Sequence, residues 1–302
     1  MRVTVTGATG RIGTRLVAAL TARGDEVTVL SRRPDDARAA LGVEAHRWRP
    51  ESEPAPAAAL AGRDGVVHLA GEDPGRRWTA ARKRRLLESR EQGTRNLVAG
   101  LRAAEPRPGV LVSASGVGYY GARGDEPVTE EAEPGDDFLA RVCAAWEREA
   151  AEAEQLGMRV VRVRTGVTLM RDGGALARML PFFRLAVGGP VAGGRQYMPW
   201  IHVDDVIGMY LAALDGAAWS GAVNATAPEP VTNREFSRAL GRALRRPAIA
   251  PVPELALRVL YGEMADVVVY GQRAVPERAQ ALGFRFAHPD LDEALRSALS
   301  HT

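Results

Sequence analysis

Two residue types with versatile chemistry are almost absent from this 302-residue chain, which has one cysteine, Cys143, and one lysine, Lys83. A single cysteine excludes an intramolecular disulfide and is typical of a protein from a reducing compartment. The single lysine leaves one position for any mechanism that needs an ammonium group. Cys143 lies between apolar neighbours in a predicted helix, so we expect it to be an inert core residue.

Long apolar runs are also absent, as is a signal-like start, because a predicted strand already begins at residue 3. We therefore expect no membrane segment and a cytoplasmic protein. The net charge is only +3, and the densest basic run, 82–85, shares a predicted helix with Glu88 and Glu91. Such a run is more typical of a solvated face than of a nucleic-acid site, so we expect no nucleic-acid partner.

The first thirty residues have the pattern of a complete dinucleotide-binding unit. The β-branched run 3–6 predicts a buried strand, residues 12–23 an amphipathic helix, and residues 26–30 a second strand. Between the first strand and the helix lie Gly7, Gly10 and Gly13. A glycine turn in this position lets backbone N–H groups and the helix N-terminus face a pyrophosphate.

The end of the second strand indicates which nucleotide would bind. In an NAD site a carboxylate at this position accepts hydrogen bonds from the ribose 2′-hydroxyl. Here the strand is followed by Ser31 and Arg32, whose donors suit a 2′-phosphate, and Arg11 in the glycine turn can approach the same group. We therefore predict NADP(H) rather than NAD. The alternative is that Arg32 and Arg33 are only solvated loop charges.

The rest of the chain continues this alternation of strands and helices. Further strands are expected at 43–48, 65–71, 109–115, 158–164 and 222–225, and long helices at 78–104 and 136–155. The pattern predicts an α/β fold, a Rossmann-type doubly wound parallel sheet with a smaller, mixed C-terminal domain on the substrate side. We expect an NADP-binding domain over 1–165, completed by about 198–227, and a smaller domain from 166–197 and 228–302.

Ligands of such sheets bind beyond the carboxyl ends of the strands, which defines one predicted crevice. The predicted cofactor-binding residues are Gly7, Thr9, Gly10, Arg11, Ile12, Ser31, Arg32, Leu69, Ala70, Gly71, Ser113, Arg164 and Thr165. We expect no metal site, since His68 lies in an apolar strand without a metal partner in reach. His202 and Asp205 are also expected to be structural, with Asp205 capping the helix that follows.

With these segments placed, the chain resembles the extended branch of the short-chain dehydrogenase/reductase superfamily over its full length. The resemblance is carried by the glycine turn, Val67–Ala70, Ser113–Ser115 and Trp200–Asp205, in the expected order. It implies a dinucleotide-binding oxidoreductase or epimerase, and a homodimer formed through the two long helices.

A narrower resemblance is to epimerase-family, or sugar-nucleotide-epimerase-like, proteins, whose members carry a C-terminal extension of unknown function. Its motifs are Arg77–Thr79, Ser89-Arg90, Gly118–Gly121, Phe138-Leu139, Trp146-Glu147 and Gly188–Pro190. The extension is matched by Pro251–Pro253, Gly262–Asp266, Gly271–Arg273, Pro276 and Gly283–Phe286.

The usual catalyst of the superfamily is missing from this sequence. The resemblance implies a tyrosine followed four residues later by a lysine, but those positions hold Phe138 and Val142. No tyrosine precedes the only lysine at that spacing. Tyr119 precedes Arg123 by four, but arginine replaces lysine poorly because its reach and donor geometry differ. The narrower family commonly shows this departure.

The remaining candidates for chemistry lie at and just after the fifth strand. We predict catalytic roles for Ser115, which matches the superfamily's serine, and for Tyr119 or Tyr120 as a proton donor. Each has a structural alternative: a strand-end hydroxyl on the backbone, or aromatic packing. The predicted substrate contacts are Arg90, Tyr197 and Trp200, with Lys83, Arg195 and Gln196 nearby, a set that suits an anionic or nucleotide-bearing substrate.

Two functions are consistent with this sequence. The first is an NADP(H)-binding, epimerase-like oxidoreductase acting on a carbonyl, hydroxyl or sugar-nucleotide compound. The second is a non-catalytic NADPH sensor or partner-binding protein that retains the fold without the catalyst. The fold alone does not decide between them.

Overall fold

A seven-stranded parallel sheet forms the centre of the computed structural model, which describes residues 1–300. The strand order is β3-β2-β1-β4-β5-β7-β11, and every neighbouring pair is parallel. The strands are β1 (Arg2–Thr6), β2 (Glu26–Ser31), β3 (Glu44–Arg47), β4 (Gly65–His68), β5 (Val110–Gly116), β7 (Arg159–Thr165) and β11 (Gly221–Ala225). The order reverses between β1 and β4, which is where a doubly wound sheet opens its ligand crevice. The predicted Rossmann-type α/β fold is confirmed.

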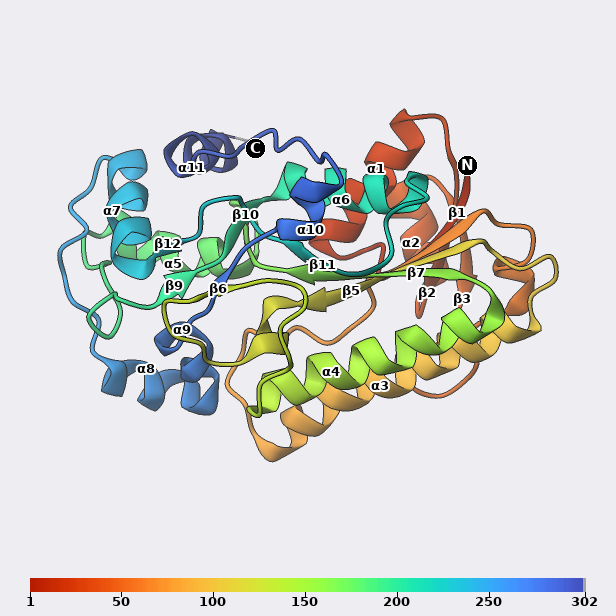
Figure 1. Cartoon of the computed structure of the whole chain (residues 1–302), viewed down its shortest axis with the longest axis horizontal. Coiled ribbons are helices and arrows are strands. Elements are labelled where there is room, and N and C mark those ends of the chain that lie inside the picture. Colours follow the sequence, from red (N-terminus) through yellow and green to blue (C-terminus); the bar gives the residue numbers. More distant parts are fainter. Residues whose placement is uncertain (301–302) are drawn as a thin grey trace.

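Helices cover both faces of this sheet (Figure 1). One face carries α1 (Arg11–Ala22), α2 (Pro34–Leu41) and α6 (Val203–Asp215), and the other carries α3 (Ala80–Ala103) and α4 (Phe138–Ala151), which lie side by side. Each face has its own apolar core, because the strands contribute apolar side chains to both sides of the sheet.

The remaining elements form the smaller part of the molecule, on the left of Figure 1. The exception is α10 (Glu277–Ala281), which packs on the core of the main sheet beside β11. The helices of the smaller part are α5 (Gly174–Arg184), α7 (Asn233–Leu244), α8 (Glu254–Tyr261), α9 (Asp266–Val269) and α11 (Leu291–Ser300). Its strands pair in twos: β8 (Val167–Leu169) with β10 (Trp200–His202), β9 (Tyr197–Met198) with β12 (Val231–Thr232), and β6 (Pro127–Val128) with β13 (Arg273–Ala274). A third apolar core unites α5, α7 and α11.

The proposed domain boundaries stay predictions. Within residues 1–300, no helix combines the length and apolarity needed to cross a membrane.

The start of α6 corrects one prediction. His202, not Asp205, is the N-cap residue, and its side chain accepts the N–H of Asp204. The Asp205 carboxylate instead accepts the backbone N–H groups of Ala287 and His288, at 2.6 and 3.1 Å. Asp205 is therefore structural, as expected, but it holds the C-terminal segment rather than its own helix.

His68 is structural, and it makes the stability of the sheet depend on pH. Its buried ring lies between the hydroxyls of Thr6, 2.7 Å from Nδ1, and Thr94, 3.0 Å from Nε2. Burial, and then the positive charge of Arg90, lower the pKa of His68 to about 3. The histidine is therefore neutral in the folded protein down to acidic pH.

We predict that the free energy of unfolding falls as the pH drops below about 6.5, the ordinary pKa of histidine. There the unfolded chain binds a proton at His68 that the folded chain excludes, so His68 contributes a loss of about 1.4 kcal/mol per pH unit. Urea titrations between pH 7 and 4.5 measure this slope, which should be flatter by that amount in His68→Gln. The half-exposed His46 provides the control variant His46→Gln. Equal slopes in wild type and His68→Gln would contradict the prediction.

Candidate functional site

The turn between β1 and α1 has the close backbone approaches that require glycine. Gly7 has a left-handed φ of +69°, and a Cβ on it would lie 2.7 Å from the Leu69 carbonyl carbon. A Cβ on Gly13 would lie 2.4 Å from the Gly7 carbonyl oxygen. Gly10 is the N-cap of α1, and no side chain caps that helix end. The first N–H groups of α1 are thus left for a ligand, as at other anion-binding helix ends.

The glycine turn opens into a cavity of about 290 Å³, which we call the nucleotide cavity. It is lined by Gly7–Gly10, Leu30–Arg32, Trp48, Pro50, Glu51, Leu69–Glu72 and Ser89. Eight of the predicted cofactor-binding residues lie in this lining: Gly7, Thr9, Gly10, Ser31, Arg32, Leu69, Ala70 and Gly71. The strand ends therefore bring together residues that are up to 64 positions apart in the sequence.

Four predicted cofactor residues have other surroundings. Arg11 donates from Nε to the backbone carbonyl of Asp172, and Ile12 packs against the core of the α1 face. Ser113 is buried within β5. The Arg164 guanidinium is buried, and it donates to Glu147 twice, to Tyr120 and to the Glu130 carbonyl. Arg164 therefore has four of its five N–H donors committed inside the protein, which speaks against cofactor binding by its side chain.

A second cavity, of about 760 Å³, follows the crevice toward the smaller part of the molecule. We call it the inner cavity. Its lining includes Ser115 and Thr165 from the sheet, Arg90 from α3, and Cys143 and Trp146 from α4. Burial raises the pKa of Cys143 to about 12, so this wall thiol is protonated at neutral pH, in agreement with an inert role.

At the inner cavity, Ser115 is tied to a buried ion pair. Its hydroxyl donates to Oε1 of Glu147 at 2.6 Å. Arg164 donates from Nε and Nη2 to the two oxygens of the same carboxylate, at 2.8 Å each, and both side chains are only 4% exposed. This bidentate geometry is among the stronger polar interactions in proteins. Glu147 is part of a family motif in the sequence, but nothing in the sequence indicated that it accepts a hydrogen bond from Ser115.

Tyr119 and Tyr120 lie behind this ion pair and do not line either cavity. Tyr120 is fully buried, donates to Oδ1 of Asn224 at 2.6 Å and accepts from Arg164. The Arg164 guanidinium stacks 3.5 Å from the centroid of the Tyr119 ring. Burial raises both phenol pKa values, that of Tyr120 to about 12. This placement speaks against the predicted proton transfer by either tyrosine.

Arg90 is a buried cation in the inner cavity. Its Nη1 donates to the backbone carbonyls of Glu72 and Leu86, and its guanidinium stacks on Trp146, 4.7 Å from a ring centroid. Within residues 1–300 no carboxylate forms an ion pair with it. Burial lowers the pKa of Arg90, which reports the cost of holding this charge away from water. An anionic ligand group would offset that cost.

The other predicted substrate residues divide into two groups. Tyr197 and Lys83 line the inner cavity, where the Lys83 ammonium pairs with Glu263 and lies over the Phe138 ring. Trp200 is buried in the third apolar core, and its indole N–H donates to the Glu229 carbonyl. Its burial speaks against the predicted substrate contact.

Comparison with known sequences identifies the family. Residues 3–225 match the model of the NAD dependent epimerase/dehydratase family, and residues 252–298 match a domain of unknown function, DUF1731. The chain therefore belongs to the NAD dependent epimerase/dehydratase family. It is 41% identical to the chloroplastic epimerase family protein SDR39U1 homolog of Arabidopsis thaliana, over 99% of this chain and 87% of that protein. It is 39% identical to epimerase family protein SDR39U1 of Bos taurus, over 99% and 100% of the two chains.

Solved structures agree with this assignment. The crystal structure of human epimerase family protein SDR39U1 with NADPH matches all of both chains, with a TM-score of 0.87 and 35% identity. A nucleoside-diphosphate sugar epimerase from Corynebacterium glutamicum matches with a TM-score of 0.79 and 34% identity, over 99% of this chain and 58% of that one. A UDP-galactose 4-epimerase, with a TM-score of 0.74 and 22% identity, shares the fold.

We predict that Glu147→Gln strongly destabilises the protein, because it leaves the Arg164 charge buried without a carboxylate. Removing one partner of a buried ion pair typically costs about 3–5 kcal/mol. The matched control is Glu131→Gln, whose carboxylate pairs with Arg278 at the surface and should cost at most about 1 kcal/mol. Urea unfolding of the three proteins measures both differences, and equal losses in the two variants would contradict the prediction.

Proposed function

We propose that this protein is an NADP(H)-binding, epimerase-like oxidoreductase whose proton chemistry runs through Ser115 and Glu147. The observation that carries the proposal is the continuity of the site: the nucleotide cavity and the inner cavity follow one edge of the sheet, and Ser115 lies in the second. The glycine cradle at Gly7 and Gly13 has the close approaches that a dinucleotide pyrophosphate needs. When bound, the nicotinamide supplies or accepts a hydride.

The choice of NADP(H) over NAD is supported by the end of β2. Ser31 and Arg32 line the nucleotide cavity, and within residues 1–300 Arg32 has no ion pair, whereas the neighbouring Arg33 pairs with Asp36. A free guanidinium beside a hydroxyl suits a 2′-phosphate. The human relative was crystallised with NADPH, and more distant structures with the same fold contain NAD.

We predict that Arg32→Ala weakens NADPH binding by about 10- to 100-fold and changes NADH binding little. The lost interaction is one charge-assisted hydrogen bond, worth about 1.5–3 kcal/mol, to a phosphate that NADH lacks. Titration calorimetry with both nucleotides measures the two dissociation constants. Arg33→Ala is the control and should retain the wild-type values. Equal losses of NADPH and NADH affinity in Arg32→Ala would remove the basis for the NADP(H) assignment.

The Ser115–Glu147 contact determines which proton role the site can take. Ser115 already donates its hydrogen to the Glu147 carboxylate, so its remaining lone pairs can accept a hydrogen bond from a substrate hydroxyl. As that hydroxyl loses its proton to Ser115, Ser115 passes its own proton to Glu147, and the return step runs in reverse. Arg164 keeps the carboxylate in position on the opposite side. This arrangement does the work of the absent tyrosine–lysine pair without a phenolate.

Arg90 and Tyr197 give the inner cavity its proposed substrate preference. Arg90 is a buried guanidinium without a carboxylate partner among the described residues, so a phosphate or carboxylate of the substrate would complete its interactions. Tyr197 adds an aromatic face to the same lining. Anionic hydroxy or carbonyl compounds, sugar nucleotides among them, are the substrates that this chemistry favours.

We predict NADPH oxidation with at least one anionic carbonyl compound or sugar nucleotide, and its loss by about 100-fold or more in Ser115→Ala. Absorbance of the reduced cofactor, followed across a substrate panel, measures the turnover. NADPH affinity should stay close to wild type in this variant, which separates proton transfer from binding.

The second candidate function is an NADPH sensor or partner-binding protein, and the missing tyrosine–lysine pair is the observation that favours it. Tight NADPH binding without turnover on any member of the panel would support the sensor and overturn the oxidoreductase. Turnover that persists in Ser115→Ala would leave the oxidoreductase standing but remove Ser115 and Glu147 from its mechanism.

A further inference from the structure

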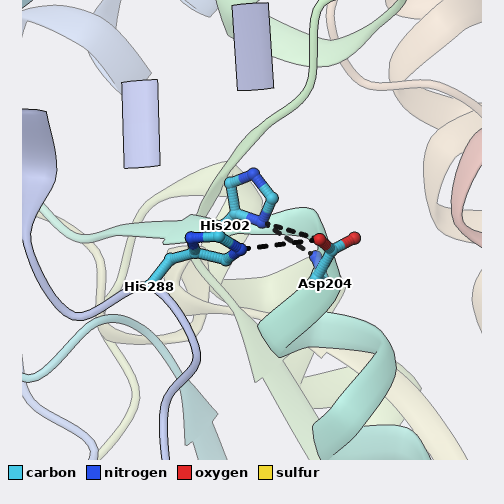
Figure 2. A group of neighbouring side chains, drawn as sticks. All are labelled: His202, Asp204 and His288. Carbon is cyan, nitrogen blue, oxygen red and sulfur yellow. Dashed lines mark hydrogen bonds and ion pairs between the residues drawn. The ribbon is translucent and has the colours of Figure 1, made fainter. Parts of the chain in front are cut away.

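Three potential metal ligands meet outside the crevice, at the start of α6. His202 ends β10, Asp204 lies in the first turn of α6, and His288 belongs to the segment that precedes α11. Figure 2 shows the two imidazole rings facing the Asp204 carboxylate from neighbouring positions. None of the three residues lines the nucleotide cavity or the inner cavity.

The distances within this cluster have the spacing of ligands around one ion. Nδ1 of His202 lies 3.5 Å from Oδ2 of Asp204, and Nε2 of His288 lies 3.6 Å from the same oxygen. All three ligand atoms lie within 4.8 Å of one another. Both distances are long for hydrogen bonds. A tetrahedral zinc ion with bonds of about 2.0–2.1 Å would hold neighbouring ligand atoms about 3.4 Å apart.

The fold fixes these ligands before any ion binds. The carboxylate of Asp205 holds the backbone of Ala287 and His288, so the C-terminal segment is anchored next to α6. His202 is 1% exposed, and its ring packs on that of His288 with 3.9 Å between centroids. The half-exposed Asp204 leaves one side of the cluster open to solvent, which provides an entry path and room for a water ligand.

One existing contact would change on binding. Nδ1 of His202 also accepts the backbone N–H of Asp204, at 3.2 Å, as the cap of α6. An ion on Nδ1 would replace that cap. A lost cap costs about 1 kcal/mol, which is small beside the binding free energy of about 8 kcal/mol for a micromolar ligand.

We propose that His202, Asp204 and His288 form a site for a divalent transition-metal ion of the zinc class. Two imidazoles and one carboxylate suit Zn²⁺, Co²⁺ or Ni²⁺, whereas Mg²⁺ and Ca²⁺ prefer oxygen ligands. The ion would link α6 to the C-terminal segment, so its role is structural. The sequence led us to expect no metal site. His288 is 86 residues from His202, so no local sequence pattern brings these residues together.

Metal titration of the full chain, purified without a histidine tag, tests this proposal. We expect one Zn²⁺ per chain with a dissociation constant below about 10 µM by calorimetry. Co²⁺ should give the visible absorption of a tetrahedral complex, and Mg²⁺ should not bind. Zinc should also raise the melting temperature, as a ligand specific to the folded state does.

Variants locate the site. His288→Ala and Asp204→Asn should each weaken Zn²⁺ binding by at least tenfold and abolish the Co²⁺ spectrum. The control His46→Ala removes another histidine that lies beside a carboxylate, Glu44, and should bind zinc as the wild type does. Absence of binding below about 1 mM Zn²⁺, or unchanged binding in His288→Ala, would overturn the proposal. NADPH affinity, measured in parallel, confirms that each variant is folded.

Discussion

The buried pair between Arg164 and Glu147 is the interaction on which the site depends. It joins β7 to α4, and through Ser115 it reaches the end of β5. A buried pair of this kind is stable only when every polar atom around it is satisfied, since both charges have left water. Here the guanidinium satisfies the carboxylate twice and Tyr120 once, and stacks on Tyr119. Strand, helix and the turn after β5 therefore hold one another in position.

In the proposed function, this pair takes over the role of the tyrosine and lysine that the superfamily usually has. A tyrosine near a lysine gains acidity from the neighbouring positive charge. For Tyr120 the effect of burial outweighs that of the neighbouring Arg164 charge, so its pKa rises to about 12. Ser115 instead contacts a carboxylate, that of Glu147, and lies between this carboxylate and the inner cavity. The proposed proton path needs no phenolate.

Sequence reasoning predicted the sheet and the nucleotide cavity well, because both depend on local patterns. A β-branched run, a glycine spacing and an amphipathic helix each follow from neighbouring residues, and Gly7 and Arg32 lie where those patterns indicated. Prediction from the sequence was less accurate for residues whose roles depend on contacts between distant segments. Asp205 has the composition of a helix cap, but its partners are 82 and 83 residues away.

Trp200 and Tyr120 show a second limit of prediction from sequence, which is the direction in which a side chain points. An aromatic residue near a predicted strand end can face a cavity or a core, and period-two alternation does not decide which one without the register. The cluster of His202, Asp204 and His288 also depends on tertiary structure, since His288 comes from the C-terminal segment. Residues that act locally were thus predictable, and residues that act through long-range contacts were not.

A crystal structure of this protein with NADPH would show whether the nicotinamide meets Ser115 and Glu147. We expect the adenosine end to occupy the nucleotide cavity with its 2′-phosphate at Ser31 and Arg32. We also expect the nicotinamide to reach the inner cavity while Ser115 keeps its 2.6 Å contact with Glu147. A nicotinamide directed away from Ser115, or a Ser115 hydroxyl that leaves Glu147 when the cofactor binds, would contradict the proposed proton path.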